Sequence, residues 1–159
     1  MSQVLRTAAF LVPAIALAAC AGTNTIRTSS DTAIVQASAA PICRGTGAAK
    51  VAQKQAAIET IKAGYDRYII VDAASANNVQ VTQTPGSYRT SGTVYGGYVN
   101  ATTTYQPGMP IMHGTHDQAF AIKMFRDSDP GSGRAISARE TLGPKWQDMV
   151  KAGSIRTCT

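Results

Sequence analysis

A short apolar run near the N-terminus limits which residues of this chain can form its fold. It predicts that the first residues are not part of the fold, so the fold must come from the residues that follow. The run extends from Ala8 to Leu17, follows a single cation at Arg6 and contains Pro13. Roughly ten apolar residues are too few for a membrane-spanning helix, which needs about 20. Residues 1–19 therefore predict a cleaved export signal rather than a permanent span, and no later segment has the required length.

The signal ends in Leu17-Ala18-Ala19-Cys20, which resembles the bacterial lipobox: an aliphatic residue, two small residues and a cysteine. In proteins with this motif the thiol receives diacylglycerol, and cleavage leaves the acylated cysteine as the first residue. The resemblance implies a lipid anchor at Cys20. Ala21 replaces the aspartate that often retains lipoproteins in the inner membrane, which favours the periplasmic face of the outer membrane. The alternative is an ordinary signal that is cut after Ala18 or Ala19 and leaves Cys20 as a free thiol.

Acylation of Cys20 leaves two further cysteines, Cys43 and Cys158. An even pair in an exported protein indicates a disulfide. The two residues bracket nearly the whole of the expected domain, and closing so long a loop stabilises the fold by about 4–5 kcal/mol. We therefore predict a Cys43–Cys158 bridge, with two unrelated buried thiols or a metal-binding pair as the alternatives.

The residues that follow the signal differ in composition from the rest of the chain. Residues 20–41 are mostly small or hydroxylated, with few large apolar side chains. This composition is typical of a flexible tether, although a weak strand pattern lies at 32–36. We therefore expect a tether at 20–41 and a single folded domain at 42–159.

Within that domain the apolar pattern changes from helical to alternating. Apolar positions three, four or seven apart predict a helix over 47–63, and Gly64 is placed to end it. Alternation at period two predicts strands over 66–73, 79–84 and 118–126.

The remaining segments complete the expected fold class. Residues 88–110 are rich in Tyr, Thr and Gly, which suits strands or a long hairpin, with Gly96-Gly97 as a turn or bulge. A terminal helical region is interrupted at Gly143-Pro144. Together these segments predict an α+β domain: a mainly antiparallel sheet of about four strands, with an N-terminal and a C-terminal helix packed on one face.

The segment 109–117 is the richest in metal-binding side chains. His113 and His116, with Met109 or Met112, offer the imidazole and thioether donors that suit copper and zinc ions. A glycine between the histidines and a proline before them disfavour a helix, and the chain has no third histidine. An ordinary loop leading into a strand is the preferred interpretation, and a periplasmic metal-binding protein is the alternative.

Four tyrosines in the Thr-rich segment suit strand positions and, where exposed, a weak candidate partner surface: Tyr88, Tyr95, Tyr98 and Tyr105. Lys+Arg number 15 against Asp+Glu 9, a net charge of +6. A modest positive field favours anionic lipid headgroups or the carboxylates of peptidoglycan, whereas an exported chain on a membrane does not meet nucleic acid.

Catalytic signatures are missing from the sequence. It contains neither G-x-S-x-G nor H-E-x-x-H, and neither remaining cysteine has an activating neighbour. We therefore predict no enzyme, no catalytic residue and no cofactor. A hydrolase of wall material, built on carboxylates that meet only in the fold, is a weaker alternative.

Several short motifs accompany the lipobox: an Ala-rich helix ending in Gly64-Tyr65-Asp66, then Tyr105-Gln-Pro-Gly108, Gly114-Thr115-His116, Ala138-Arg-Glu140 and Leu142-Gly-Pro144. With them the chain resembles small proteobacterial lipoproteins for which no activity is established. The resemblance covers most residues after about 43 and implies the compartment and the extent of the domain. It carries over no catalytic residue. The expected function is that of a cell-envelope lipoprotein, a structural or binding module that faces the periplasm.

Overall fold

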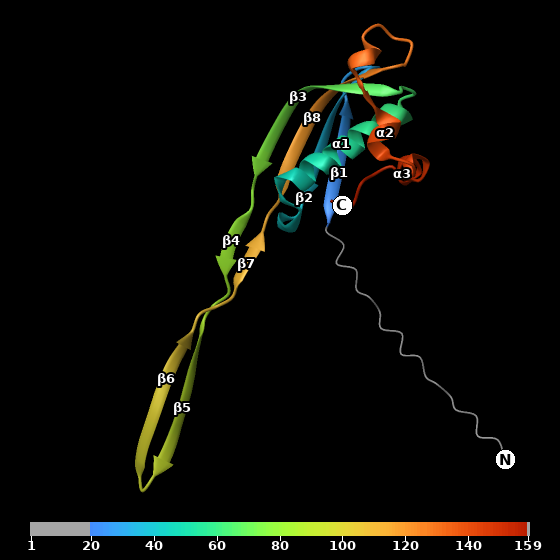
Figure 1. Cartoon of the computed structure of the whole chain (residues 1–159). Helices are drawn as coiled ribbons and strands as arrows, with labels where there is room; N and C mark the ends of the chain where they lie inside the picture. Colours follow the sequence, from blue (N-terminus) through green and yellow to red (C-terminus); the bar gives the residue numbers. More distant parts are fainter. Residues whose placement is uncertain (1–19, 159) are drawn as a thin grey trace, which may run out of the picture.

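The fold has two layers, an antiparallel sheet and a group of helices on one of its faces (Figure 1). The computed structural model describes residues 20–158, so the predicted signal peptide at 1–19 lies outside the described residues. Five strands form the main sheet in the order β1 (Ala21–Arg27), β2 (Thr32–Ala39), β8 (His116–Phe125), β3 (Arg67–Asn77) and β9 (Ile136–Ser137). All neighbouring strands in this order are antiparallel.

Helix α1 (Arg44–Lys62) lies across this sheet and supplies most of the second layer. A short 3-10 turn, η1 (Pro41–Cys43), leads into it. Its sheet-facing side is rich in alanine, which brings the helix axis close to the strands. The helix predicted at 47–63 is confirmed, and Gly64 adopts φ +82° just beyond its end, a conformation that favours glycine.

The core lies between α1 and the strands. Strand β8 contributes Phe120, Ile122 and Met124 from one face, as period-two alternation requires, and Ile58 meets them from α1. Tyr68 on β3 is fully buried, and its hydroxyl lies 3.1 Å from Oγ1 of Thr141. Burial raises the pKa of Tyr68 because the phenolate would lose its hydration.

The C-terminal helical region consists of two short helices that pack against α1, α2 (Ala138–Leu142) and α3 (Trp146–Ala152). The predicted break is present between them, where Gly143 takes φ +75°. The Ser137 hydroxyl caps α2 by accepting a hydrogen bond from the Glu140 N–H. Before these helices the chain passes through a second 3-10 turn, η2 (Ser132–Arg134).

A buried amide joins the first strand, the helix and the C-terminal tail. Gln55 on α1 accepts hydrogen bonds from Oγ1 of Thr23 and the N–H of Ile155. Its Nε2 donates to Oε1 of Glu59 and to the carbonyl of Gly153. Both polar atoms of this almost fully buried side chain are therefore paired.

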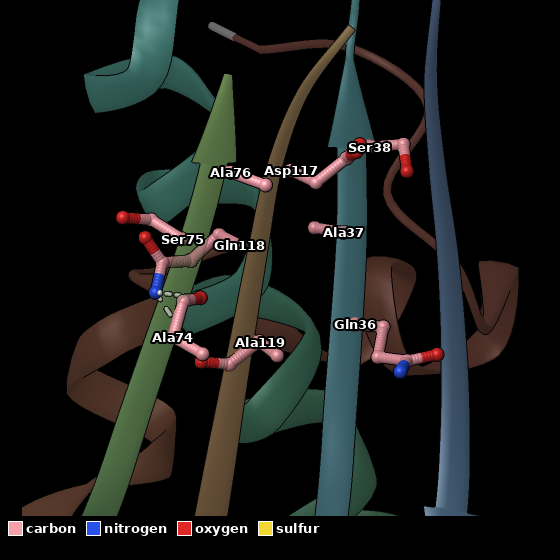
Figure 2. Close-up of a pocket in the computed structure, with 9 residues that line it drawn as sticks. All are labelled: Gln36, Ala37, Ser38, Ala74, Ser75, Ala76, Asp117, Gln118 and Ala119. Carbon is pink, nitrogen blue, oxygen red and sulfur yellow. Dashed lines mark hydrogen bonds between the residues drawn. The ribbon is translucent and has the colours of Figure 1, made fainter. Parts of the chain in front are cut away.

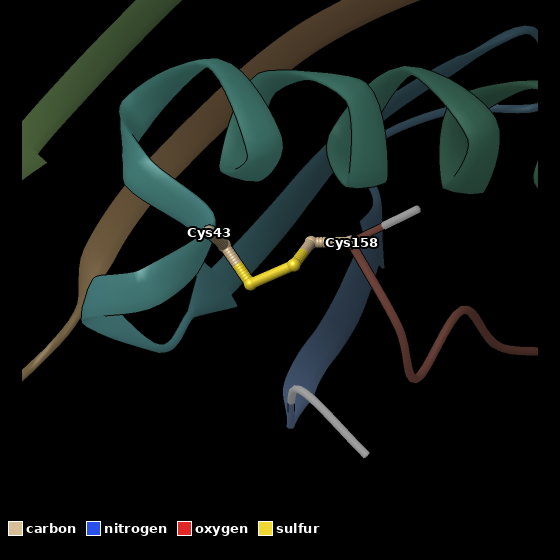
Figure 3. Close-up of a disulfide and its surroundings, with 2 residues drawn as sticks. All are labelled: Cys43 and Cys158. Carbon is tan, nitrogen blue, oxygen red and sulfur yellow. A yellow bond between two sulfur atoms is a disulfide. The ribbon is translucent and has the colours of Figure 1, made fainter. Parts of the chain in front are cut away.

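The predicted disulfide is confirmed. Cys43 and Cys158 are bridged, with their Cα atoms 5.8 Å apart and a sequence separation of 115 (Figure 3). The bridge fastens the tail to the start of α1, where Gly47 leaves room for both cysteine Cβ atoms. It therefore closes a loop that contains the main-sheet strands β3, β8 and β9 together with all of the helix α1, whereas β1 and β2 lie before it.

The α+β class and the antiparallel sheet are confirmed, with five strands in the main sheet. The prediction of a flexible tether at 20–41 is wrong for most of that segment, because residues 21–27 and 32–39 form β1 and β2. The small side chains that suggested a tether alternate in burial along β2, where Ala33, Ala37 and Ala39 face α1. A close-lying helix favours such small residues beneath it.

A long two-stranded arm leaves the main sheet where β3 and β8 run on together (Figure 1). The outgoing chain forms β4 (Gln80–Gln83) and β5 (Ser87–Tyr95), and the returning chain forms β6 (Tyr98–Gln106) and β7 (Pro110–His113). Strand β4 pairs with β7, and β5 pairs with β6. At about 3.3 Å per residue, residues 78–95 give the arm a length of roughly 50–60 Å.

Candidate partner-binding arm and acylation site

The arm consists of an inner and an outer ladder separated by a break. Pro85 and Pro107 face this break, and neither has an N–H to continue a ladder. Thr84 bridges it, because its N–H donates to the carbonyl of Met109 and its Oγ1 accepts from the Met109 N–H. Gly108 lies so close to the Thr84 backbone that any Cβ there would clash.

The outer hairpin turns through Gly96 and Gly97, both with positive φ (+56° and +84°). Two consecutive residues of this kind make the tight turn whose twist matches that of paired strands. The register then runs without a bulge from Tyr95 opposite Tyr98 to Ser87 opposite Gln106. The turn that the glycine pair suggested in the sequence is confirmed.

The two faces of the outer hairpin differ in composition. We call the more apolar one the tyrosine–valine face; its members are Tyr88, Thr90, Gly92, Val94, Val99, Ala101, Thr103 and Tyr105. Two contacts order it: the rings of Tyr88 and Tyr105 lie 5.1 Å apart, and the hydroxyls of Thr90 and Thr103 lie 2.8 Å apart. Its side chains are nevertheless mostly exposed, with Val99 at 71%.

The four tyrosines predicted for a partner surface are all exposed, but they do not form one cluster. Tyr88 and Tyr105 lie together near the base of the outer hairpin on the tyrosine–valine face. Tyr95 and Tyr98 flank the turn on the opposite face, and Tyr95 is 88% exposed. The arrangement offers aromatic side chains at both ends of the hairpin and on both faces.

The candidate metal ligands lie on the inner ladder. His113 ends β7 opposite Gln80, and His116 begins β8 two residues after Gly114, whose φ is +99°. Met109 and Met112 are exposed. Residues 20–158 contain no group of three or more His, Cys, Asp or Glu side chains placed to hold a metal ion. Metal binding by these residues stays a prediction.

Asp117 lies where the arm joins the main sheet. Its Oδ2 accepts a hydrogen bond of 2.6 Å from Nδ2 of Asn78, the residue that leads from β3 into the arm. The neighbouring Ser38 hydroxyl, with smaller effects from Thr115 and Asn78, lowers the pKa of Asp117 despite the opposing effect of burial. These contacts attach the base of the arm to two strands of the sheet.

A shallow depression of about 370 Å³ lies on the main sheet next to this junction (Figure 2). Strands β2, β3 and β8 line it, mainly with alanine and serine side chains. The Gln118 side chain crosses it and donates from Nε2 to the carbonyls of Ala74 and Ala119, at 3.0 and 3.2 Å. The amide donor of Gln118 is therefore paired within the protein, whereas Oδ1 of Asp117, which also lines the depression, has no hydrogen-bond partner among residues 20–158.

Cys20, the predicted acylation site, is exposed and directly precedes β1. Its carbonyl accepts a hydrogen bond from the Ala40 N–H, and the next residue, Ala21, donates to the carbonyl of Arg156. The residue is therefore fixed to the globular part by its backbone, while its side chain stays accessible.

Sequence reasoning found the tyrosines and the turn but missed the arm as a separate element. One signal was available: between Asp72 and Asp117, Arg89 is the only formally charged residue. A long stretch of polar but uncharged residues with high β-propensity is typical of strands whose edges pair with other strands, because solvent-exposed strand edges usually carry charged residues.

Comparison with protein-family models, with curated proteins and with solved structures gives no match for this chain. Of the helices between residues 20 and 158, none combines the length and the apolar composition that spanning a bilayer requires.

Proposed function

We propose that this protein is a non-enzymatic lipoprotein of the bacterial cell envelope, held by acyl chains on Cys20, whose arm binds a partner. The observation that carries the proposal is the arm: roughly 50–60 Å of paired strand whose large apolar and aromatic side chains are exposed. Exposed apolar groups concentrated on one element are typical of a surface that another molecule covers.

The anchor is supported by the sequence before Cys20 and by its accessibility. The residue lies at the surface, next to the first strand, so a lipid attached there would not disturb the core. The Cys43–Cys158 bridge suits an oxidising compartment such as the periplasm. The periplasmic face of the outer membrane is the proposed location, from Ala21 in place of aspartate.

Intact-mass measurement of protein extracted from membranes tests the anchor. We expect the mass of residues 20–159 increased by acyl chains, and a Cys20→Ser variant that keeps its signal or is released from the membrane. Wild-type protein that retains residues 1–19, or lacks any added mass, would refute lipidation.

Site-specific photocrosslinking in intact cells tests the arm as the binding element. A crosslinking amino acid at Tyr98 is expected to give a reproducible adduct, whereas the same group at exposed Lys151 on α3 is the matched control. Adducts of equal yield at both positions, or at neither, would contradict a binding role for the arm.

A further inference from the structure

The outer hairpin has two strand edges that nothing covers. Within residues 20–158, β5 pairs with β6 alone, so each strand has one side without a neighbouring strand. The two-residue turn makes Tyr95 and Tyr98 a hydrogen-bonded pair, and bonded and non-bonded pairs then alternate along the ladder. Main-chain groups of residues such as Ala101 and Thr103 therefore point outward along β6.

The usual devices that protect a free strand edge are missing from this hairpin. Proteins block edges with lysine, proline, bulges or a covering loop. Residues 87–106 contain no proline and no lysine, their register is regular, and Arg89 is their only charge. Their Thr, Tyr and Val content is high, and these residues favour strands. Such an edge is chemically complementary to another strand.

The distribution of charge along the chain indicates which molecule supplies the strand that pairs with this edge. The chain carries a net charge of +6, and nearly all its charged residues lie outside the arm. Two copies that met through their globular parts would bring like charges together, whereas two arms meet almost without charge. The arm is thus the surface on which one copy can approach another at least electrostatic cost.

We propose that the arms of neighbouring copies of this chain pair edge to edge, with β6 of one copy antiparallel to β5 of the next. If β5 of one copy paired with β5 of another, an Arg89 side chain from each copy would lie at the same interface. Pairing β6 with β5 avoids this meeting of two arginines. It also keeps all hairpins pointing in one direction, as copies anchored through Cys20 in one membrane require. That last argument rests on the proposed function.

A lipid surface is a less suitable occupant of the same edges. Main-chain N–H and C=O groups that enter hydrocarbon without a partner cost several kcal/mol each. A second arm satisfies these groups and extends the tyrosine–valine face into a wider sheet.

The oligomeric state of the mature chain, residues 20–159 with Cys20→Ser, tests the proposal by sedimentation and light scattering over a dilution series. We expect an oligomer that dissociates on dilution. Thr103→Pro removes one outward N–H, whereas Thr103→Ala loses the same side chain and keeps that N–H. The proline variant is expected to raise the dissociation constant by about tenfold or more, and the alanine variant by much less.

Orientation is tested by mixing two single-cysteine variants of the Cys20→Ser protein, Ser91→Cys on β5 and Thr102→Cys on β6, with a short thiol crosslinker. Crosslinks between the two variants support the proposal, and crosslinks confined to β6 with β6 overturn it. A monomer at every concentration overturns it, as does an oligomer that survives deletion of residues 87–106. A monomer whose arm binds vesicles of phosphatidylethanolamine and phosphatidylglycerol assigns the surface to lipid instead.

These outcomes are independent of acylation, because every variant carries Cys20→Ser. Failure of the mass measurement on membrane-extracted protein would refute the anchor and leave arm pairing intact. Variants are compared only where the Cys43–Cys158 bridge and the far-ultraviolet circular dichroism match those of the parent protein.

Discussion

The two strands β3 and β8 continue from the globular part into the strands of the arm, but only the globular part has a core. Along β8, alternate side chains such as Ile122 are buried beneath α1, with 1% exposed. Where the strands run on past His116 the alternation continues, yet Ile111 on β7 is 48% exposed. The difference is the helix, which covers the main sheet and not the arm (Figure 1). An alternating pattern indicates which face is apolar; a second layer decides whether that face becomes core.

The largest expected difference between the two regions concerns the disulfide. A Cys43→Ala/Cys158→Ala variant loses a closure spanning 115 positions and is expected to lose about 4–5 kcal/mol of unfolding free energy. Urea unfolding followed by tryptophan fluorescence measures this loss, because Trp146 belongs to the globular part. Reduction of wild-type protein should give a similar value; an unchanged unfolding midpoint would contradict the assigned role of the bridge.

Equivalent truncations in the two regions sharpen the comparison further. Ile122→Ala leaves a cavity beneath α1 and is expected to cost about 3 kcal/mol. Ile111→Ala removes a half-exposed side chain on the arm and is expected to cost less than about 0.5 kcal/mol. Chemical denaturation of both variants checks the contrast, and similar losses would mean that the arm unfolds with the core as one unit.

The buried amide gives an intermediate effect. Gln55→Ala leaves the Ile155 N–H and the Gly153 carbonyl without their partner, which is expected to cost about 1–3 kcal/mol. Gln36→Ala, on the exposed face of β2, is the matched control and should be close to neutral. Hydrogen exchange at Ile155 provides a local readout, because protection of this amide should fall in the Gln55→Ala protein alone.

The smallest effect is expected where the two regions join. The pKa of Asp117 is held below its ordinary value of 3.8, so its contribution to stability is present above that value and is lost as the pH falls through the folded pKa. Asp117→Asn should therefore reduce the acid dependence of stability in this pH range, with little change near neutrality. Asp148→Asn, on the exposed surface of α3, is the control. Identical acid unfolding curves for the Asp117→Asn and wild-type proteins would exclude the proposed hydrogen bonds.

Much of the fold follows from local sequence signals. The helix over 44–62, the strand ending at Phe125 and the turn at Gly96-Gly97 each carry a period or a turn signature that their own residues determine. The disulfide followed from counting cysteines, together with the expectation that the chain is exported. These features depend on a few neighbouring residues or on chemistry, not on tertiary packing.

The features that sequence did not predict depend on contacts between distant segments. Residues 21–39 have the composition of a tether and become strands because β2 pairs with β8, far along the chain. Gln55 gives no sequence signal, since its partners come from β1 and from the tail. The arm was predicted as strands but not as a projection from the sheet. The local sequence of residues 87–106 carries no signal for whether a helix packs over them.

The position of Cys20 would determine the orientation of the molecule at a membrane if this residue carries the proposed acyl chains. Ala21 pairs with Ala39, and Ala39 pairs with His116, so the attachment point and the root of the arm share one end of the sheet. Because β1 begins at Ala21, directly after Cys20, no linker would separate the acyl chains from the sheet. They would hold this end of the sheet against the lipid headgroups. The globular part would then lie above its own anchor, and the arm would leave the sheet on the membrane side and lie along the headgroup surface rather than reach toward the cell wall. In that orientation, other molecules at the same membrane surface, rather than the cell wall, would be the partners within reach of the arm.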